Sequence, residues 1–325
     1  MKLFVTGAAG FVGSNVVDVA LERGHEVVGF DNFSTGREAF LEAAGRHPRF
    51  RLVRGDITSL EQLVGAMGAG TDAVVHLAAN ADVRRGTEQP IKDLQVNTVG
   101  TWNVLEAMRT TGARRIIFSS TGSVYGESEV FPTPEDAPFP VQTSLYAASK
   151  AAGEGLISAW CHGFGISATV FRMVSVLGPR YTHGHVFDFM RALMKDASRL
   201  RVLGDGQQLK SYLHVSDLTR AFFLALERPA AGYEVLNVGH DDALRVVQSI
   251  ALITARLKVA PTLEFTGGTR GWIGDSPRIQ LDTRRLLALG WAPSRSLPDA
   301  IHDTVDYLVA RPELFDGPDP FVPTR

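Results

Sequence analysis

Tyr146 and Lys150 are four positions apart in the run Tyr146-Ala147-Ala148-Ser149-Lys150. In a helix this spacing places both side chains on one face. A free tyrosine has a pKa of about 10, so Tyr146 acts as a base near pH 7 only if its pKa falls by about three units, or roughly 4 kcal/mol. Nearby positive charges, such as an ammonium group one turn away, can lower it. The pair therefore indicates proton transfer, although a surface helix with an unrelated Tyr and Lys would give the same pattern.

A run of hydroxyl side chains, Ser119-Ser120-Thr121-Gly122-Ser123, follows the apolar segment that ends at Phe118. A hydroxyl at the carboxyl end of a strand can hydrogen-bond a reacting oxygen of a substrate. Serine and threonine are also common in turns, so a plain turn is the alternative interpretation.

The segment Gly7-Ala8-Ala9-Gly10-Phe11-Val12-Gly13 joins a short apolar run to an amphipathic one. Glycines at this spacing allow a tight turn and let backbone N–H groups approach a pyrophosphate, which the following helix N-terminus stabilises. The pattern indicates a dinucleotide site. Taken alone it is weak, because an ordinary strand–turn–helix junction also uses glycine.

Acidic residues follow the next two apolar runs. Asp31, in Gly29-Phe30-Asp31-Asn32, can accept hydrogen bonds from the adenosine ribose and would repel the 2′-phosphate of NADP. The sequence therefore favours NAD, although Arg37 could soften that repulsion. Asp56-Ile57 could flank the adenine, and the alternative for Asp56 is a residue of a helix N-terminal turn.

The elements that position these residues alternate between short apolar runs and amphipathic stretches. The runs are nearly continuous, as in parallel strands covered on both faces. The alternation predicts an α/β fold with a doubly wound parallel (Rossmann) sheet. The predicted strands are Leu3–Val5, Glu26–Phe30, Phe50–Val53, Ala73–Leu77, Arg115–Phe118 and Ile166–Met173, and the predicted helices include Phe11–Arg23, Val96–Thr111 and Thr143–Phe164.

The pattern becomes less regular after about residue 175. We expect an NAD-binding domain over residues 1–175 and a smaller C-terminal α/β substrate domain over 176–325, with some segments returning to the first domain. Phe131–Pro140 carries four prolines and is predicted to be a loop. The predicted helices of the second domain are Phe187–Lys195, Val215–Glu227, Ala243–Leu257 and Pro298–Ala310.

Composition narrows the classes of protein. Of 325 residues, 45% are apolar and 21% charged, and the formal net charge is −2, so no basic field favours nucleic acid or an anionic membrane. No apolar run approaches a membrane span and no signal peptide is expected. The single cysteine, Cys161, excludes an intrachain disulfide and is expected to be a buried, inert thiol. We expect a cytoplasmic protein.

Several motifs in order resemble those of the extended short-chain dehydrogenases/reductases, within the nucleotide-sugar epimerase/dehydratase family. The resemblance covers essentially the whole chain and is strongest to the UDP-sugar 4-epimerase branch. Each motif is weak alone, but the ordered set is specific. The matching segments are Gly7-x-x-Gly10-x-x-Gly13, His76-Leu77-Ala78-Ala79, Asn97-Thr98-x-Gly100-Thr101, Ser119-Ser120-Thr121-x-x-Val124-Tyr125-Gly126, Tyr146-x-x-x-Lys150, Phe171-Arg172, Gly178-Pro179-Arg180, Gly204-Asp205-Gly206 and Tyr212-x-His214-Val215-x-Asp217.

The resemblance implies a role for each matching residue. Tyr146 is the general base and acid, Lys150 lowers its pKa and holds the nicotinamide ribose, and Thr121 hydrogen-bonds the reacting O4. The implied NAD-binding residues are Gly7, Gly10, Phe11, Val12, Gly13, Asp31, Asn32, Asp56, Ile57, Leu77, Ala78, Ala79, Asn97, Ser119, Tyr146 and Lys150, and the implied substrate-binding residues are Val83, Thr121, Ser175, Lys210, Arg270 and Asp275.

The resemblance further implies transient oxidation of a nucleotide sugar at C4, rotation of the 4-ketose, and return of the hydrogen to the opposite face. Related 4,6-dehydratases carry an Asp-Glu pair after the threonine, but here Gly122-Ser123 cannot perform acid–base chemistry near neutral pH. Asp31 disfavours NADP-dependent ketosugar reductases. We therefore expect C4 epimerisation of UDP-glucose/UDP-galactose or of UDP-glucuronate/UDP-galacturonate. The alternatives are a UDP-glucuronate decarboxylase, an epimerase acting at another carbon, and an NAD-binding regulatory protein.

Three departures from the family pattern concern the substrate. Ser175 replaces a frequent asparagine, Lys210-Ser211 replaces an Arg-Asp pair, and Arg270 and Asp275 are spaced more widely than usual. Arg180-Tyr181-Thr182-His183-Gly184-His185 is a polar loop that could accept a C6 carboxylate or have no ligand role. It is not a convincing metal site, and no metal is expected. If the family habit holds, the helices at Val96–Thr111 and Thr143–Phe164 pair in a homodimer.

Overall fold

The computed structural model describes residues 1–316 apart from 82–85, 87, 139–140, 230–231 and 273–274. The chain divides into two compact units, each described here by itself. The first comprises Met1–Val124, Ser144–Met173 and Thr219–Leu236, and the second comprises Tyr125–Thr143, Val174–Leu218 and Asn237–Arg325. The predicted boundary at residue 175 falls beside one of these junctions, while residues 125–143 and 219–236 cross to the other unit.

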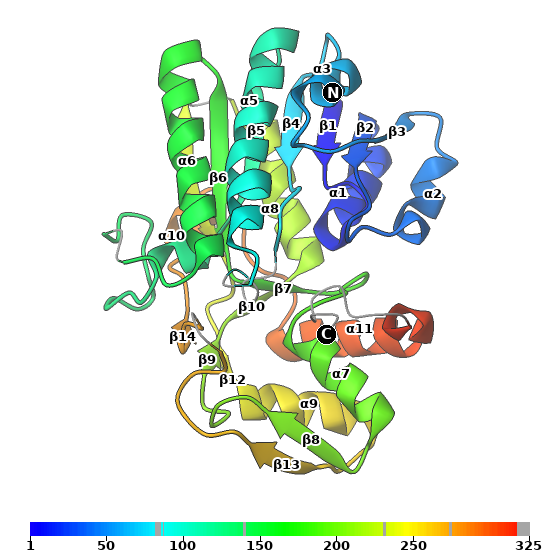
Figure 1. Cartoon of the computed structure of the whole chain (residues 1–325), viewed down its shortest axis with the longest axis vertical. Helices are drawn as coiled ribbons and strands as arrows, with labels where there is room; N and C mark the ends of the chain where they lie inside the picture. Colours follow the sequence, from blue (N-terminus) through cyan, green and yellow to red (C-terminus); the bar gives the residue numbers. More distant parts are fainter. Residues whose placement is uncertain (82–85, 87, 139–140, 230–231, 273–274, 317–325) are drawn as a thin grey trace. The chain divides into compact units, whose positions relative to one another are not determined.

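A seven-stranded parallel sheet forms the centre of the first unit (Figure 1). The strand order is β11-β6-β5-β4-β1-β2-β3, so the predicted doubly wound sheet is confirmed. The chain leaves β1 toward β2 and β3, then returns to place β4 on the other side of β1. The strands are β1 (Lys2–Thr6), β2 (Glu26–Asp31), β3 (Phe50–Arg54), β4 (Ala73–His76), β5 (Arg115–Thr121), β6 (Ser167–Met173) and β11 (Tyr233–Val238).

This reversal of strand order positions the dinucleotide site. In doubly wound sheets, ligands bind at the carboxyl ends of the strands where the order reverses. Here that point lies between β1 and β4, which pair in parallel with Thr6 opposite His76. The glycine-rich turn follows Thr6 and the Leu77-Ala78-Ala79 segment follows His76, so the two meet at one edge of the sheet.

Helices flank the sheet and bury its apolar side chains. The core beside α3 and α5 contains Phe4, Phe30 and Phe118, all fully buried. α5 and α6 lie side by side in Figure 1 and pack on one another. The helices of this unit are α1 (Phe11–Glu22), α2 (Glu42–Gly45), α3 (Leu60–Met67), α4 (Pro90–Asp93), α5 (Gly100–Thr111), α6 (Leu145–Phe164) and α8 (Val215–Glu227), whose first residues lie in the second unit.

The helix predicted over Val96–Thr111 has an irregular beginning. Leu94–Val99 forms a π-helix, and the α-helix starts only at Gly100. At Gly112, φ is +84° and the helix ends in the left-handed conformation that glycine favours. A π-helical turn is rare and often occurs at functional sites.

The second unit combines short strands with several helices. β8 (Arg199–Val202) pairs with β13 (Thr262–Phe265), β7 (Ser175–Leu177) with β10 (Tyr212–His214), and β9 (Leu209–Lys210) lies between β12 (Leu244–Arg245) and β14 (Arg278–Ile279). Its helices are α7 (His185–Lys195), α9 (Val246–Leu257), α10 (Arg284–Ala288) and α11 (Leu297–Val309).

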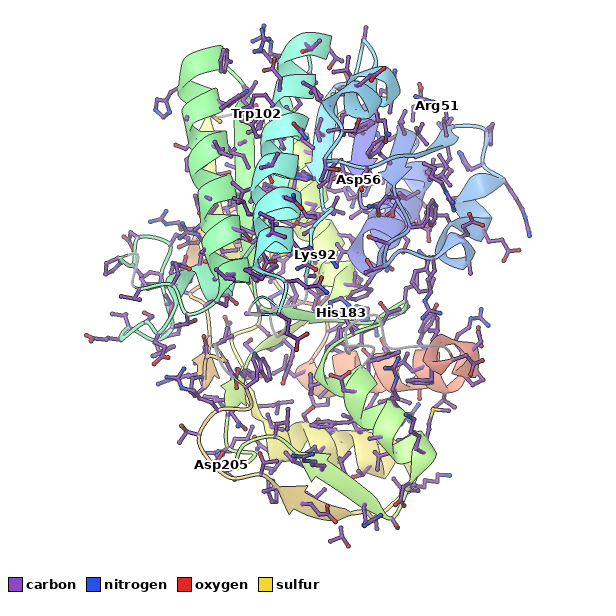
Figure 2. The ribbon with its side chains drawn as sticks, in the orientation of Figure 1. Arg51, Asp56, Lys92, Trp102, His183 and Asp205 are labelled. Carbon is purple, nitrogen blue, oxygen red and sulfur yellow. The ribbon has the colours of Figure 1, made fainter. Side chains whose placement is uncertain are left out.

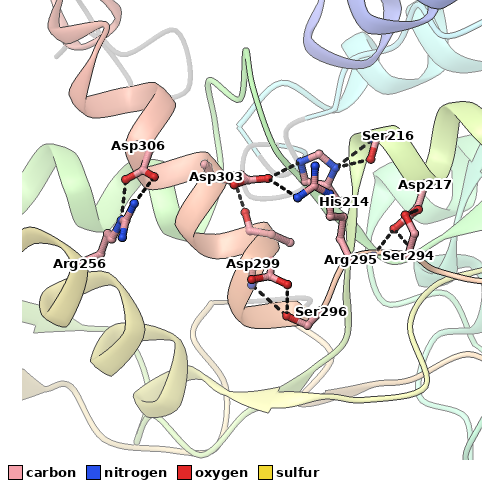
Figure 3. Close-up of polar contacts among 12 residues, drawn as sticks. His214, Ser216, Asp217, Arg256, Ser294, Arg295, Ser296, Asp299, Asp303 and Asp306 are labelled. Carbon is pink, nitrogen blue, oxygen red and sulfur yellow. Dashed lines mark hydrogen bonds and ion pairs between the residues drawn. The ribbon is translucent and has the colours of Figure 1, made fainter.

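Polar side chains hold α11 in place within this unit (Figure 3). The fully buried Asp217 carboxylate accepts hydrogen bonds from the Ser294 and Arg295 N–H groups and from the Ser294 hydroxyl, at 2.6–3.1 Å. Arg256 on α9 pairs with Asp306 on α11. Asp217, one of the family-like motif residues, therefore has a structural role here.

No helix in the described part of the chain is long and apolar enough to cross a membrane. Among the same residues, no cluster of three or more His, Cys, Asp or Glu side chains has the arrangement of a metal site. Cys161 on α6 is partly buried, and burial raises the pKa of its thiol to about 11.

Candidate active site

The glycine-rich turn is closed so tightly that side chains would collide. At Gly7, φ is +68°, and a Cβ there would lie 2.8 Å from the Ala78 backbone nitrogen. A Cβ on Gly13 would lie 1.9 Å from the Gly7 carbonyl oxygen. Gly10 precedes α1 and no side chain caps this helix end. The turn therefore leaves room for a phosphate at a helix N-terminus, which fits a dinucleotide.

Asp31 shapes the same turn from the end of β2. Its carboxylate accepts the Ala9 N–H and the Phe33 N–H, each at 2.8 Å. Burial raises the pKa of Asp31, while these two hydrogen bonds oppose the rise. Asp31 thus fixes the glycine-rich turn as well as standing where an adenosine ribose is expected.

The other predicted cofactor residues lie on neighbouring strand ends. Asp56, labelled in Figure 2, accepts a hydrogen bond from Asn32 at 2.8 Å and others from the Thr58 N–H and hydroxyl, so it forms the turn before α3. Burial alone would raise the pKa of Asp56, but these hydrogen bonds outweigh burial, so the pKa is lowered. Ile57 is buried close to Gly100. The Leu77 and Ala78 N–H groups both donate to the Thr6 hydroxyl, and Ala79 follows them.

Tyr146, Lys150 and Thr121 lie together in the first unit. The Ser144 hydroxyl caps α6 by accepting the Ala147 N–H, which places Tyr146 in the first turn. Thr121 ends β5, and its hydroxyl accepts the Ser123 N–H at 3.1 Å. The Tyr146 and Thr121 side chains lie close enough for the Thr121 hydroxyl to influence the Tyr146 pKa. Both residues remain partly accessible, whereas Lys150 is buried with its ammonium 4.2 Å from the centre of the Phe118 ring.

The ligand-free site keeps Tyr146 protonated. Burial raises the pKa of Tyr146 to about 12, and the Asp93 carboxylate adds to the rise, while the Thr121 hydroxyl opposes it. Burial lowers the pKa of Lys150 to about 7, and Glu154 opposes that fall. Both shifts favour the uncharged form of the side chain.

Asn97 in the π-helix is 1% exposed and its side chain forms hydrogen bonds to several neighbouring residues. Its amide oxygen accepts the Asn80 N–H at 2.8 Å, and its amide nitrogen donates to the Ser149 hydroxyl at 2.9 Å and to Asp93 at 3.3 Å. Asn97 was predicted to line the NAD site, and here it holds the residue preceding Lys150. The sequence alone did not predict roles for Asn80, Asp93 or Ser149. Asn80 directly follows the His76–Ala79 motif, and Ser149 lies between Tyr146 and Lys150.

His76 and Ser119 complete the support of the strand ends. His76 contacts the Thr6 and Thr101 hydroxyls at 2.7 and 3.1 Å, and burial lowers its pKa to about 3, so it stays neutral. The Ser119 hydroxyl donates to the His76 carbonyl oxygen at 3.1 Å. The predicted cofactor residue Ser119 is therefore used internally in this structure.

The predicted substrate residues of the second unit gather around Asp275. Its carboxylate, 3% exposed, pairs with the Lys210 ammonium at 2.7 Å and accepts the Gly271 N–H at 2.9 Å. Lys210 also donates to the Ser276 carbonyl oxygen. Arg270 donates to the Asp275 carbonyl oxygen and pairs with Glu127. Asp275, a predicted substrate-binding residue, is thus already engaged by Lys210 on β9 and by Gly271 of its own loop.

Two further substrate predictions have different outcomes. Ser175 begins β7 and is exposed, opposite Tyr212 in the strand pair. Val83 lies outside the described residues.

The loop predicted to accept a carboxylate contains one neutral histidine. His185 contacts the Ser249 hydroxyl at 2.8 Å and stacks on Tyr212 at 4.7 Å between ring centres. Burial, together with Lys210, lowers the pKa of His185 to about 3. His185 therefore brings no positive charge to this loop. His183 stacks on Tyr181 at 5.9 Å.

A glycine-rich turn at a sheet reversal, together with a tyrosine and lysine beside a strand-end threonine, defines a dinucleotide-dependent enzyme that moves a proton at its substrate. Residues 3–239 match the NAD dependent epimerase/dehydratase family. The chain belongs to this family, and its cofactor is NAD.

Relatives match along most of the chain. A UDP-glucose 4-epimerase of Mycolicibacterium smegmatis is 35% identical over 315 residues, covering 95% of this chain and 98% of the relative. A Thermus thermophilus UDP-glucose 4-epimerase in complex with NAD is 30% identical, with a TM-score of 0.85, covering 95% of this chain and 99% of that one. A Bacillus cereus UDP-glucuronic acid 4-epimerase variant is 28% identical, with the same TM-score and coverage. These relatives support an NAD-dependent nucleotide-sugar epimerase.

Proposed function

We propose that the enzyme interconverts UDP-glucose and UDP-galactose through a 4-keto sugar. The observation that carries this proposal is that the Tyr146 and Thr121 side chains lie near one another, beside a turn that has no carboxyl group. The residues after Thr121 are Gly122 and Ser123, which cannot catalyse elimination of water near neutral pH. Transient oxidation at C4 is the chemistry that these groups support.

Each residue has a defined task in this scheme. NAD, which the glycine-rich turn and Asp31 would hold, would supply hydride transfer from C4 and back to it. Tyr146 takes the O4 proton on oxidation and gives it back on reduction. The Thr121 hydroxyl, whose oxygen accepts the Ser123 N–H, hydrogen-bonds the reacting O4. Positive charge in the filled site must lower the Tyr146 pKa from about 12 toward neutrality before proton transfer is efficient.

The loop around His185 supports a neutral hexose as the substrate. A uronate carries a C6 carboxylate, which needs a cation or several donors. His185 is neutral and its ring nitrogen is engaged by Ser249. UDP-glucuronate remains the second candidate because Arg180 in the same loop is a cation and because the B. cereus relative is a UDP-glucuronic acid 4-epimerase.

The test is product analysis by proton NMR. The purified protein is incubated separately with UDP-glucose and UDP-glucuronate, without and then with added NAD, and the anomeric signals are followed. We expect a galacto-configured product from UDP-glucose. A pentose product from UDP-glucuronate would reassign the enzyme as a decarboxylase, and conversion of UDP-glucuronate to UDP-galacturonate alone would reassign the sugar.

We also propose that two copies associate through α5 and α6. Exposed apolar side chains continue from α4 and the π-helix into α5, with Ile91, Leu94, Val99 and Trp102 each 38–56% exposed (Figure 2 labels Trp102). Trp160 on α6 packs against Trp102, and its indole N–H is buried with no acceptor in the described structure. A second copy would cover this surface.

We place the protein in the cytoplasm, consistent with one cysteine and a thiol of raised pKa.

A further inference from the structure

A buried ion pair lies one helical turn beyond Lys150. Glu154 and Arg172 are each 3% exposed. The Arg172 guanidinium spans the carboxylate, with Nη2 at 2.7 Å from Oε2 and Nε at 3.1 and 3.2 Å from the two oxygens. The Ser120 hydroxyl also donates to Glu154. The carboxylate is therefore held in one position by side chains of β5 and β6.

This carboxylate shares a helix face with the catalytic pair. Tyr146, Lys150 and Glu154 follow one another at four-residue spacing on α6, and such neighbours have Cβ atoms about 5–6 Å apart. Ser120 immediately precedes Thr121, so the Ser120 hydrogen bond also joins the end of β5 to α6.

The other titratable groups near Lys150 leave Glu154 as its stabilising charge. His76 on β4 is neutral because burial lowers its pKa to about 3. Tyr146 is protonated in the ligand-free protein. The carboxylate of Asp93 on α4 acts on Tyr146, Arg172 on β6 pairs with Glu154, and Tyr233 on β11 is uncharged at neutral pH.

We propose that Glu154 is a positioning residue whose fixed negative charge, held by Ser120 and Arg172, keeps the buried Lys150 ammonium protonated. Without that charge, burial would favour the neutral amine. A neutral Lys150 could not supply positive charge beside Tyr146. The inference rests on the proposed catalytic role of Lys150, but the state of Lys150 can be measured without substrate.

The direct test is a pH titration of Lys150 by 13C NMR. The chain has six lysines, so a protein labelled at lysine Cε gives few signals, and Lys150→Met assigns the one of interest. Glu154→Gln keeps the size and hydrogen-bonding shape but removes the charge. An opposite charge at this range shifts a pKa by about 1–3 units, so the Lys150 midpoint should fall by about one unit or more.

Three matched variants separate charge from shape. Glu154→Asp keeps the charge and should bring the midpoint back toward wild type. Ser120→Ala removes the hydrogen bond but keeps the charge, so the midpoint should stay close to wild type. The double variant Glu154→Gln/Arg172→Gln removes both charges of the ion pair and so leaves no unpaired buried arginine. It provides the test if circular dichroism shows that Glu154→Gln alone does not fold. The Lys150 midpoint should fall in the double variant as well.

The pH dependence of kcat/KM adds a functional readout. In Glu154→Gln the alkaline limb should move to lower pH together with the Lys150 midpoint. An unchanged midpoint in both Gln variants would overturn the inference. A midpoint that falls while no variant or wild type shows turnover would support the role of Glu154 and instead contradict the proposed reaction.

Discussion

Removing the Lys210 charge should have two separable effects. Lys210 and Asp275 form a pair at 2.7 Å whose side chains are 13% and 3% exposed. Lys210→Met keeps a long, unbranched side chain at this position but leaves the Asp275 carboxylate without its cation. Breaking a buried pair in this way costs about 3–5 kcal/mol of unfolding free energy. Adding Asp275→Asn removes the lone charge, and its amide oxygen can still accept the Gly271 N–H, so most of that stability should return.

Substrate binding should respond differently. If Lys210 also contacts the substrate diphosphate, losing that charge-assisted contact costs about 1.5–3 kcal/mol. Because each 1.4 kcal/mol corresponds to about a factor of ten, KM for UDP-glucose should rise by about 10–100-fold. The rise should persist in the double variant, because Asp275→Asn supplies no cation.

The assay combines urea unfolding, followed by tryptophan fluorescence, with steady-state kinetics on wild type, both single variants and the double variant. Trp272, whose ring centre is 5.9 Å from the Lys210 ammonium, reports on this region. Recovery of stability without recovery of KM supports a diphosphate contact. If the double variant recovers both, Lys210 serves only to neutralise Asp275, and the reasoning is refuted.

Three other predictions address the remaining parts of the site. Tyr146→Phe should lower kcat by at least about 100-fold with little change in folding, since it removes the proton-transferring hydroxyl, and near-normal turnover would reject this base. Gly13→Ala should abolish copurification of NAD, because its Cβ would lie 1.9 Å from the Gly7 carbonyl oxygen; absorbance and mass spectrometry of the extract measure this, and undiminished NAD would show that the turn adapts. Trp102→Glu should yield a monomer by light scattering while Val309→Glu, at a more exposed apolar position on α11, should not; identical masses for both variants would count against the α5–α6 interface.

The sheet could be predicted because each buried strand carries its own signal. Runs such as Ala73–Leu77 and Arg115–Phe118 are apolar and short, and the strands formed at Ala73–His76 and Arg115–Thr121. The catalytic helix was also readable, because Ser144 caps it immediately before Tyr146. Two-residue strands such as β9 and β12 carry too few side chains to show a period, and their pairing depends on distant segments.

Electrostatics could not be read from residue types alone. Tyr146 and Lys150 have the predicted spacing, but burial shifts both pKa values toward the uncharged forms. His185 looked like a possible cation and is neutral because it is buried. The π-helix at Leu94–Val99 depends on where Asn97 must point, which no local propensity encodes.

The fate of the hydrogen at C4 tests transient oxidation most directly. UDP-glucose carrying deuterium at C4 is converted by the enzyme in ordinary water, and the product is examined by NMR and mass spectrometry. The scheme predicts UDP-galactose that keeps the deuterium at C4, because the same hydrogen leaves and returns. Loss of the label to solvent would contradict oxidation at C4, with return of the same hydrogen, as the route to the product.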